Sequence, residues 1–266
     1  MSGFTPRQVT SLTNPLVKTV RGLHLRKDRE ESGLFLAEGL KIAAEAVDCG
    51  YTPRIVMFGP DAREHAVLQR IAQACETAGG EVVEVGRDIL EKISRRDNPQ
   101  TVVAVFEQVF APLSGLVSSA AKCWVALQAV RDPGNLGTII RTADSAGCGG
   151  VLLVGECCDP YSVEAVRATM GSIFAVPIYK ASVAEFLAWR QTWPGAVVGT
   201  LLSAVTDYKA ADYHRPTLIL MGNEQAGLPP ELAAACDVTV KIPMRGRADS
   251  LNLSVATGIM IYAATD

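Results

Sequence analysis

Three polar, glycine-containing segments in the C-terminal half of the sequence could carry chemistry. They are Arg131–Arg141, Gly222–Leu228 and Pro243–Ser254, and each follows an apolar run of strand length. In an open parallel sheet, ligands bind at the carboxyl ends of the strands, so these loops are candidate binding segments. The glycines that bound Gly222–Gly227 let a backbone approach a ligand closely. Taken one at a time, these residues are more often helix caps and turn glycines.

Several common enzyme classes lack their signatures in this sequence. It contains no G-x-G-x-x-G, no G-x-x-x-x-G-K-[ST] and no G-x-S-x-G, which counts against hydride transfer, ATP hydrolysis and serine hydrolysis. There are three histidines and seven cysteines, without a C-x-x-C pair or a zinc-ligand spacing. We therefore expect neither a metal site nor a disulfide framework.

The elements that must position the three loops alternate between strand and helix. Residues 5–31 read as mostly helical, with a restart at Asn14-Pro15, and strands and helices then alternate to residue 106, which predicts a small α/β sandwich. From residue 124 onward, short apolar strands again alternate with helices, which predicts a mostly parallel sheet. The predicted strands are 34–37, 54–58, 81–85, 102–106, 124–130, 151–154, 175–179, 196–202, 217–221 and 238–242. The predicted helices are 38–49, 62–77, 88–94, 136–146, 163–170, 183–191, 230–235 and 252–264.

The segment 111–121 is small, flexible and poor in charge, so we place a linker there. It would separate a domain of residues 1–110 from a domain of residues 122–266. In the second domain, a helix beginning near Leu136 would put Asn135 at its N-cap and Arg141 nearly two turns further on.

Composition indicates a soluble, cytoplasmic protein. Of the 266 residues, 48% are hydrophobic, which is ample for a packed core. No apolar stretch approaches the roughly 20 residues of a membrane helix, and residues 1–10 do not resemble a secretory signal. The net charge of −3 excludes a general polyanion binder. A local exception between Lys18 and Arg29 holds five cations against one carboxylate, and on charge alone it is either a solvated helix face or a nucleic-acid contact.

Taken together, the three loops resemble a known family. The segments "DPGNLGTIIRTADSAG", "LILMGNEQAGLP" and "KIPMRGRADSLNLSVATGIMIY", in this order, resemble the three motifs of the SPOUT superfamily. More narrowly, they are similar to SpoU/TrmH-type RNA ribose 2′-O-methyltransferases over residues 122–264. The earlier segment "SLTNPLVKTVRGLHLRKDREESGLFLAEGLKIAAEAV" resembles the substrate-binding domain of this family, which is similar to ribosomal proteins that bind RNA kink-turns.

The resemblance implies a fold, an assembly and a cofactor. It implies an α/β sheet with a deep trefoil knot in its C-terminal segment, although knots are rare in proteins. It also implies an obligate homodimer whose two sites lie at the subunit interface, and no metal. The cofactor would be S-adenosyl-L-methionine, held largely by main-chain groups of the second and third motifs. Matched position by position, the cofactor-binding residues are Thr200, Leu201, Gly222, Ile242, Met244 and Leu251.

The implied reaction is methyl transfer to a ribose 2′-hydroxyl of RNA. The family pattern assigns the active site to Asn135, Arg141, Glu224, Ser250 and Asn252. Arg141 is often proposed as the base, but a guanidinium with a pKa above 12 stays charged. A cation that binds the phosphate and lowers the pKa of the 2′-hydroxyl is physically easier. Glu224 could then accept the proton or only orient its neighbours, while Asn135, Ser250 and Asn252 would hold the geometry.

The resemblance also favours RNA contact for the basic segment. The candidate RNA-binding residues are Lys18, Arg21, Arg26, Lys27 and, as a phosphate ligand, Arg167. The additional N-terminal domain favours ribosomal RNA, of the large subunit, over transfer RNA. The alternatives are a tRNA 2′-O-methyltransferase, a methyltransferase for another substrate, and a non-catalytic RNA-binding protein on the same fold. Five intact motif residues argue against the non-catalytic reading, and the N-terminal domain argues against a substrate other than RNA.

Overall fold

The computed structural model describes residue 4 and residues 6–266, and these form two compact units. The N-terminal unit comprises Met1–Gln108 together with Tyr161–Phe174, and the C-terminal unit comprises Val109–Pro160 and Ala175–Asp266. The segment Tyr161–Phe174 therefore packs with the N-terminal unit, although the C-terminal unit surrounds it in the sequence.

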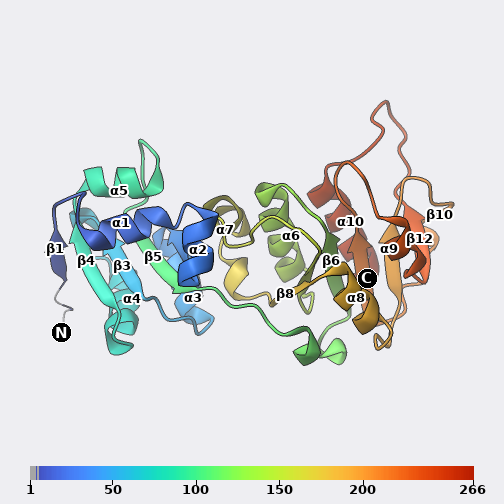
Figure 1. Ribbon diagram of the computed structural model, residues 1–266, viewed down its shortest axis with the longest axis horizontal. Helices are drawn as coiled ribbons and strands as arrows, with labels where there is room; N and C mark the ends of the chain where they lie inside the picture. The colour runs from blue at the N-terminus through green and yellow to red at the C-terminus, as the bar shows by residue number, and fades with distance from the viewer. Residues whose placement is uncertain (1–3, 5) are drawn as a thin grey trace. The chain divides into compact units, whose positions relative to one another are not determined.

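The N-terminal unit is built on a five-stranded sheet with the order β1-β4-β3-β5-β2 (Figure 1). Strands β1, β4 and β3 are parallel, while β5 runs antiparallel to both β3 and β2. The strands are β1 (Arg7–Val9), β2 (Leu34–Glu38), β3 (Ile55–Phe58), β4 (Glu81–Val85) and β5 (Val102–Glu107). The helices are α1 (Pro15–Gly22), α2 (Arg26–Ser32), α3 (Leu40–Asp48), α4 (Ala66–Thr77), α5 (Arg87–Ser94) and α7 (Val163–Thr169).

Alternation along the strands of this sheet supplies two apolar faces. Met57 and Val83, with their same-face neighbours, share a core with Val17 and Val20 of α1 and Ile89 of α5. Helices α3 and α4 pack on the other side of the sheet. Because successive side chains of a strand point to opposite faces, both faces are covered by helices and the unit is a three-layer sandwich.

The C-terminal unit is built on a seven-stranded, wholly parallel sheet with the order β10-β12-β9-β11-β6-β7-β8. Helices α6 and α10 pack against each other, and α10 also contacts β11 and β6, whereas α8 and α9 cover the other face. The strands are β6 (Cys123–Gln128), β7 (Val151–Val154), β8 (Ile178–Ala181), β9 (Val197–Thr200), β10 (Thr206–Asp207), β11 (Thr217–Met221) and β12 (Val238–Lys241). The helices are α6 (Pro133–Ser145), α8 (Val183–Arg190), α9 (Pro230–Ala234) and α10 (Leu253–Thr265).

Short 3₁₀ helices complete the secondary structure, and they lie at Pro60–Ala62, Leu113–Gly115, Ser118–Ala120, Ser172–Phe174 and Tyr208–Ala210. No helix in the described part of the chain is long and apolar enough to span a membrane. Among the same residues, no group of three or more His, Cys, Asp or Glu side chains could hold a metal ion.

Outside the candidate site, the structure corrects the sequence predictions in four places. Arg7–Val9 is a strand instead of a helix because it pairs in parallel with β4, and Thr5 of that prediction lies outside the described residues. Helix α4 begins at Ala66 instead of residue 62, because the side chain of His65 accepts a hydrogen bond from Val67 N and caps the helix. Strand β8 starts three residues later than predicted, after a 3₁₀ turn. Strand β10 was not predicted.

Candidate active site

A pocket of about 340 Å³ opens at the carboxyl ends of three strands in the C-terminal unit. Its walls come from the ends of β9 and β11, the segment after β12, and the beginning of α10. Its size lies at the lower end of the range for small-molecule sites. The six residues that the sequence predicts to bind the cofactor all line this pocket, namely Thr200, Leu201, Gly222, Ile242, Met244 and Leu251.

Gly222 can only be glycine in the loop that forms one wall of the pocket. A Cβ atom at this position would lie 2.2 Å from the carbonyl carbon of Gly227 and 2.4 Å from the nitrogen of Leu228. The loop folds back on itself because Asn223 and Gly227 exchange two main-chain hydrogen bonds of 3.1 and 2.9 Å. Gly227 has φ of +68°, which an L side chain rarely adopts.

Asn223 ties this loop to the strand beside it. Its Oδ1 accepts hydrogen bonds from the backbone nitrogens of Gln225 (2.9 Å) and Ala226 (3.2 Å). Its Nδ2 donates to the carbonyl oxygen of Ala129, just after β6, over 2.7 Å. This bond fixes the loop Gly222–Leu228, called the motif-2 loop below, relative to the end of β6, after which the first motif begins. The sequence analysis did not single out Asn223, although an Asn in a glycine-bounded loop is a typical turn residue.

The structure corrects the predicted beginning of α6. The N-cap is Asp132, whose Oδ1 accepts a hydrogen bond from the backbone nitrogen of Asn135 over 2.6 Å, and Pro133 occupies the first turn. Proline is favoured there because its missing N–H would have no helical partner. Asn135 therefore lies inside the first turn, and its side chain is not used as a cap.

The side chain of Asn135 instead contacts the third motif. Asn252 Nδ2 donates to Asn135 Oδ1 over 2.9 Å, although the two residues are 117 positions apart. Asn252 is also the N-cap of α10, since its Oδ1 accepts from the backbone nitrogen of Ser254 over 2.9 Å. One side chain therefore fixes the beginning of α10 and joins it to the beginning of α6.

The other three predicted catalytic residues lie in two places. Glu224 and Ser250 line the pocket and are exposed, and Ser250 Oγ donates to Asp249 Oδ1 over 3.1 Å. Arg141 is exposed on α6, does not line the pocket, and makes no side-chain hydrogen bond or ion pair with any other described residue. Within one chain, Glu224 and Ser250 thus line the pocket, and Asn135 and Asn252 form a hydrogen-bonded pair where α6 and α10 begin. Only Arg141 is outside both groups.

The pocket combines apolar side chains with main-chain polar groups. Leu201, Ile242 and Leu251 offer surfaces for the faces of a planar ring, while the backbone of the motif-2 loop offers donors and acceptors for its edge. This combination suits an adenine nucleoside. Sequence reasoning missed several lining residues that flank the motif positions, namely Leu202, Ser203, Met221, Leu253 and Ala256.

Comparisons with known proteins identify the family of this chain. The family model described as "SpoU rRNA Methylase family" matches residues 122–262, and the "MRM3-like substrate binding domain" matches residues 14–104. The chain belongs to the SpoU rRNA methylase family.

Full-length relatives of this SpoU family member are also found. A Bacillus subtilis protein named 23S rRNA (guanosine(2553)-2′-O)-methyltransferase RlmP is 30% identical over 96% of this chain and 98% of its own length. A Streptomyces viridochromogenes protein named 23S rRNA (uridine(2479)-2′-O)-methyltransferase is 31% identical over 97% of this chain and 91% of its own length. The crystal structure of an AdoMet-bound rRNA methyltransferase from Sinorhizobium meliloti superposes with a TM-score of 0.91 at 48% identity, over 97% of both chains.

In this SpoU family member, the predicted RNA-binding residues of the N-terminal unit fall into three groups. Lys18 and Arg21 are exposed on α1. Arg26 and Lys27 form ion pairs with Glu30 and Glu31, one helical turn further along α2, at 2.7 and 3.7 Å. Exposed pairs of this kind contribute little to stability and leave the cations accessible to solvent.

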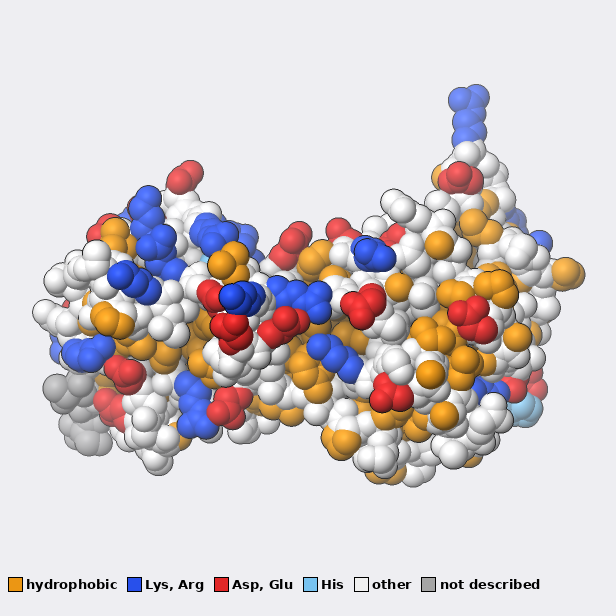
Figure 2. All heavy atoms as spheres, in the orientation of Figure 1, with side chains coloured by type: hydrophobic (Ala, Val, Ile, Leu, Met, Phe, Trp, Pro, Cys, Tyr) orange, Lys and Arg blue, Asp and Glu red, His pale blue; other side chains and the backbone are white. Residues whose placement is uncertain are grey.

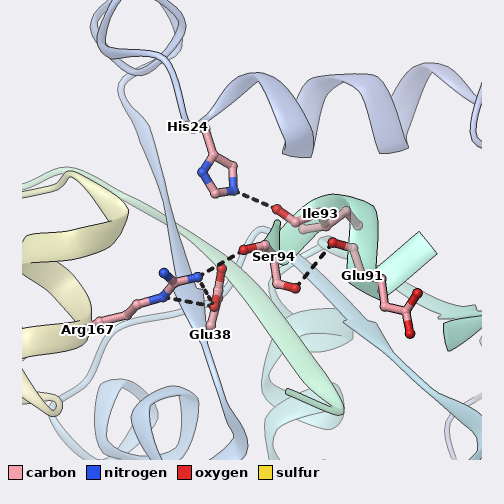
Figure 3. A network of polar contacts seen from close by, with 6 residues as sticks. All are labelled: His24, Glu38, Glu91, Ile93, Ser94 and Arg167. Carbon is pink, nitrogen blue, oxygen red and sulfur yellow. Dashed lines mark hydrogen bonds and ion pairs between the residues drawn. The ribbon is translucent and has the colours of Figure 1, made fainter. Parts of the chain in front are cut away.

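Arg167, the fifth predicted RNA ligand, is engaged inside the N-terminal unit (Figure 3). Its Nη2 lies 2.6 Å from Glu38 Oε2 and also donates to the carbonyl oxygen of Ser94 over 3.1 Å. The Glu38 side chain is only 2% exposed. Burial raises the pKa of Glu38, while the hydrogen bond and the charge of Arg167 act in the opposite direction. The contacts of Arg167 in this structure are therefore internal.

Proposed function

We propose that this chain transfers a methyl group from S-adenosyl-L-methionine to a ribose 2′-hydroxyl of large-subunit ribosomal RNA. The observation that carries the proposal is the pocket at the ends of β9, β11 and β12, where the second and third motifs meet. The relatives that match almost the whole chain are named for this reaction on 23S rRNA. The similar Sinorhizobium structure is described as AdoMet-bound.

Main-chain groups and apolar side chains of the pocket would bind the cofactor together. The backbone of the motif-2 loop and the side chains of Ile242, Met244 and Leu251 would hold the cofactor. When bound, the cofactor supplies a methyl group already activated by its positive sulfur. The remaining tasks of the protein are to orient the 2′-oxygen for in-line attack and to remove its proton.

Arg141 and Glu224 would perform these two remaining tasks. The Arg141 guanidinium would bind the phosphate next to the target ribose and stabilise negative charge that develops on the 2′-oxygen. Glu224 would accept the proton as the new oxygen–carbon bond forms and the sulfur–carbon bond breaks. The Asn135–Asn252 hydrogen bond would keep α6, which carries Arg141, in register with α10.

We propose that two copies of the chain pair through α10. Val255 and Tyr262 lie seven residues apart, on one side of this helix, and are 52% and 49% exposed. The two side chains form a narrow apolar stripe, and an exposed apolar stripe on a surface helix favours an interface. Pairing there would also give Arg141, which lies outside the pocket of its own chain, a way to reach a site at the interface.

The same proposal includes a knotted fold, a mode of RNA binding and a cellular location. Gly222–Leu228 and the segment from Ile242 to Asn252 would form a deep trefoil knot around the cofactor. The N-terminal unit would bind RNA in the manner of ribosomal proteins that recognise kink-turns. An enzyme of ribosomal RNA would act in the cytoplasm.

The proposal is tested by pairing wild type with an Arg141→Ala variant. Wild-type protein should transfer tritium from labelled S-adenosylmethionine to unmodified large-subunit rRNA. The variant should transfer at least about 100-fold more slowly, by analogy with removal of other charge-stabilising donors. Its affinity for the cofactor, measured by calorimetry, should stay within about twofold, because Arg141 does not line the pocket.

Three outcomes would contradict the proposal. Near-normal turnover by Arg141→Ala would remove the assigned role of this residue. Label in transfer RNA in place of ribosomal RNA would overturn the substrate. Absence of both label and cofactor binding in wild type would favour a non-catalytic RNA-binding protein.

A further inference from the structure

The end of helix α5 in the N-terminal unit carries two adjacent arginines. Helix α5 buries Ile89, Leu90 and Ile93 and ends at Ser94. Arg95 and Arg96 follow directly and are exposed. Arg95 has φ of +54°, a left-handed conformation that is uncommon for a residue with a Cβ atom. Such a conformation persists only where the surrounding structure holds it.

Two side chains hold this helix end through consecutive carbonyl groups (Figure 3). The His24 ring nitrogen Nε2 lies 2.6 Å from the carbonyl oxygen of Ile93. Arg167 Nη2 donates to the carbonyl oxygen of Ser94 over 3.1 Å. The last carbonyl groups of a helix lack helical partners, and basic side chains commonly satisfy them. The backbone that presents Arg95 and Arg96 is therefore fixed from two sides.

Arg167, on helix α7, is itself held by a buried carboxylate of the sheet. Arg167 also donates through Nε and Nη2 to Glu38 Oε2, over 3.1 and 2.6 Å, and Glu38 ends strand β2. The charge of Arg167 is thus compensated by Glu38, and its carbonyl contact positions the loop that begins at Arg95.

The same region of the surface gathers the exposed cations of α1. Helices α1 and α5 share one apolar core, so their outer faces are adjacent. Figure 2 shows Lys and Arg side chains concentrated over these two helices. The exposed cations are Lys18, Arg21, Lys92, Arg95 and Arg96, and within the described part of the chain none of them forms an ion pair.

Other arginines of the same unit are paired with carboxylates. Arg87 of α5 lies 3.0 Å from Glu91, and Arg54 lies 2.6 Å from Glu107. Among the described residues, Asp28 and Asp97 form no ion pair with the cations of the α1–α5 surface. Five exposed cations that form no ion pair with another described residue thus lie on the α1–α5 surface, in a chain whose net charge is −3.

We propose that Arg95 and Arg96 bind the sugar–phosphate backbone of the substrate RNA, with His24 and Arg167 as positioning residues. The proposal rests on the proposed RNA substrate and extends the basic surface beyond the predicted segment at Lys18–Arg29. RNA phosphate is the favoured ligand because planar guanidinium groups bind phosphate oxygens in pairs. Arg95 is the left-handed C-cap of α5, and the contacts of His24 and Arg167 fix the backbone from which Arg95 and Arg96 project.

The test compares two double variants of the full-length chain that lose the same charge. In Arg95→Gln/Arg96→Gln the unpaired arginines are removed. In the control, Arg54→Gln/Arg70→Gln, both arginines are ion-paired, with Glu107 and Asp48. The probe is unmodified large-subunit rRNA transcribed in vitro, and the dissociation constant is measured across a series of salt concentrations.

The proposal predicts a selective loss of RNA binding. The Arg95/Arg96 variant should bind at least about tenfold more weakly at 0.1 M salt, and the slope of log K against log salt should fall by about 1.4 to 1.8, as expected for two lost phosphate contacts. The control variant should change affinity less than about twofold. If the Arg95/Arg96 variant keeps both affinity and slope, the proposal is overturned.

The positioning role of His24 has its own readout. His24→Ala should weaken RNA binding about fivefold, the loss expected for one hydrogen bond. His24→Gln, which can still donate to Ile93, should restore most of it. Equal affinity of the alanine and glutamine variants would contradict the positioning role.

A measurement on unsubstituted protein guards against misfolding of the variants. RNA binding should slow amide hydrogen exchange across residues 92–97, and unchanged exchange at saturating RNA would overturn the proposal. The outcomes are separate from those for catalysis. Normal methylation and unchanged RNA affinity of Arg95→Gln/Arg96→Gln would refute only this inference. If this variant binds RNA more weakly than the control variant but wild type does not methylate RNA, this inference is supported and the proposed reaction is refuted.

Discussion

Gly222 shows how the proposed cofactor site depends on one residue without a side chain. The main chain of Gly227 and Leu228 comes within 2.6 Å of the place that a Cβ atom would occupy. These neighbours are backbone atoms in a loop closed by two hydrogen bonds, so they cannot rotate away as a side chain could. The folded-back loop therefore requires glycine at this position.

Gly222→Ala should therefore weaken cofactor binding. The loop must move to accept the methyl group, and we expect the dissociation constant for S-adenosylmethionine to rise at least about tenfold, the equivalent of about 1.4 kcal/mol. Calorimetric titration measures this. The matched control is Gly246→Ala in the motif-3 loop, where a Cβ atom would meet nothing within 4 Å. Equal affinities of the two variants would contradict the account of the loop.

At this scale the sequence predicted more of the pocket than of the contacts around it. Gly222 of the second motif and Ile242 and Leu251 of the third could be matched to motif positions because each motif is continuous in the sequence. The hydrogen bond between Asn135 and Asn252 joins residues 117 positions apart, and the pairing of Arg167 with Glu38 spans 129. Such contacts depend on the tertiary fold, which no local pattern encodes.

Helices α6 and α10 are joined where both begin. Asn252 caps α10 through its oxygen and contacts Asn135 of α6 through its nitrogen. The two atoms of one amide thus serve two purposes, the stability of α10 and the placement of α6. Substitutions at Asn252 can separate these purposes.

Asn252→Asp should keep stability and lose activity, whereas Asn252→Ala should lose both. Aspartate remains a good N-cap, while alanine costs about 1 kcal/mol of unfolding free energy. Neither can donate to Asn135, so we expect methyl transfer to fall at least about tenfold in each variant. Urea unfolding followed by tryptophan fluorescence reports on this unit, because all three tryptophans lie in it. An aspartate variant with normal methyl transfer would refute the proposed role of the amide nitrogen.

Element boundaries were predictable where local signals determine them. Apolar runs identified most strands of both sheets, and the wholly parallel arrangement of the C-terminal sheet confirms the expectation drawn from strand–helix alternation. The beginning of α6 differs from the predicted one near Leu136, because Asp132 and not Asn135 caps the helix. Strand β1 was missed because three residues become a strand only by pairing with β4.

At the scale of the whole molecule, two observations support the proposed pairing of two copies of the chain. The apolar stripe of α10 is exposed in a single copy, and Arg141 lies outside the pocket of its own chain. Pairing through α10 would bury the stripe.

Val255→Asp/Tyr262→Asp should therefore convert the protein to a monomer. Light scattering should then give the mass of one chain, 28.3 kDa, in place of twice that value, because burying two carboxylates in an apolar interface is unfavourable. Methyl transfer should fall with the dimer. Val117→Asp is the control, since Val117 is 59% exposed but lies away from α10 in the sequence. A wild-type monomer with full activity would refute pairing as a requirement.

Methyl transfer to a ribose 2′-hydroxyl is tested most directly by identifying the atom that receives the methyl group. Unmodified large-subunit rRNA is incubated with wild-type protein and tritium-labelled S-adenosylmethionine and is then hydrolysed completely with alkali. A 2′-O-methyl group removes the nucleophile for backbone cleavage, so the account predicts label in alkali-resistant dinucleotides. Label confined to mononucleotides would mean that a base is methylated and would contradict the account.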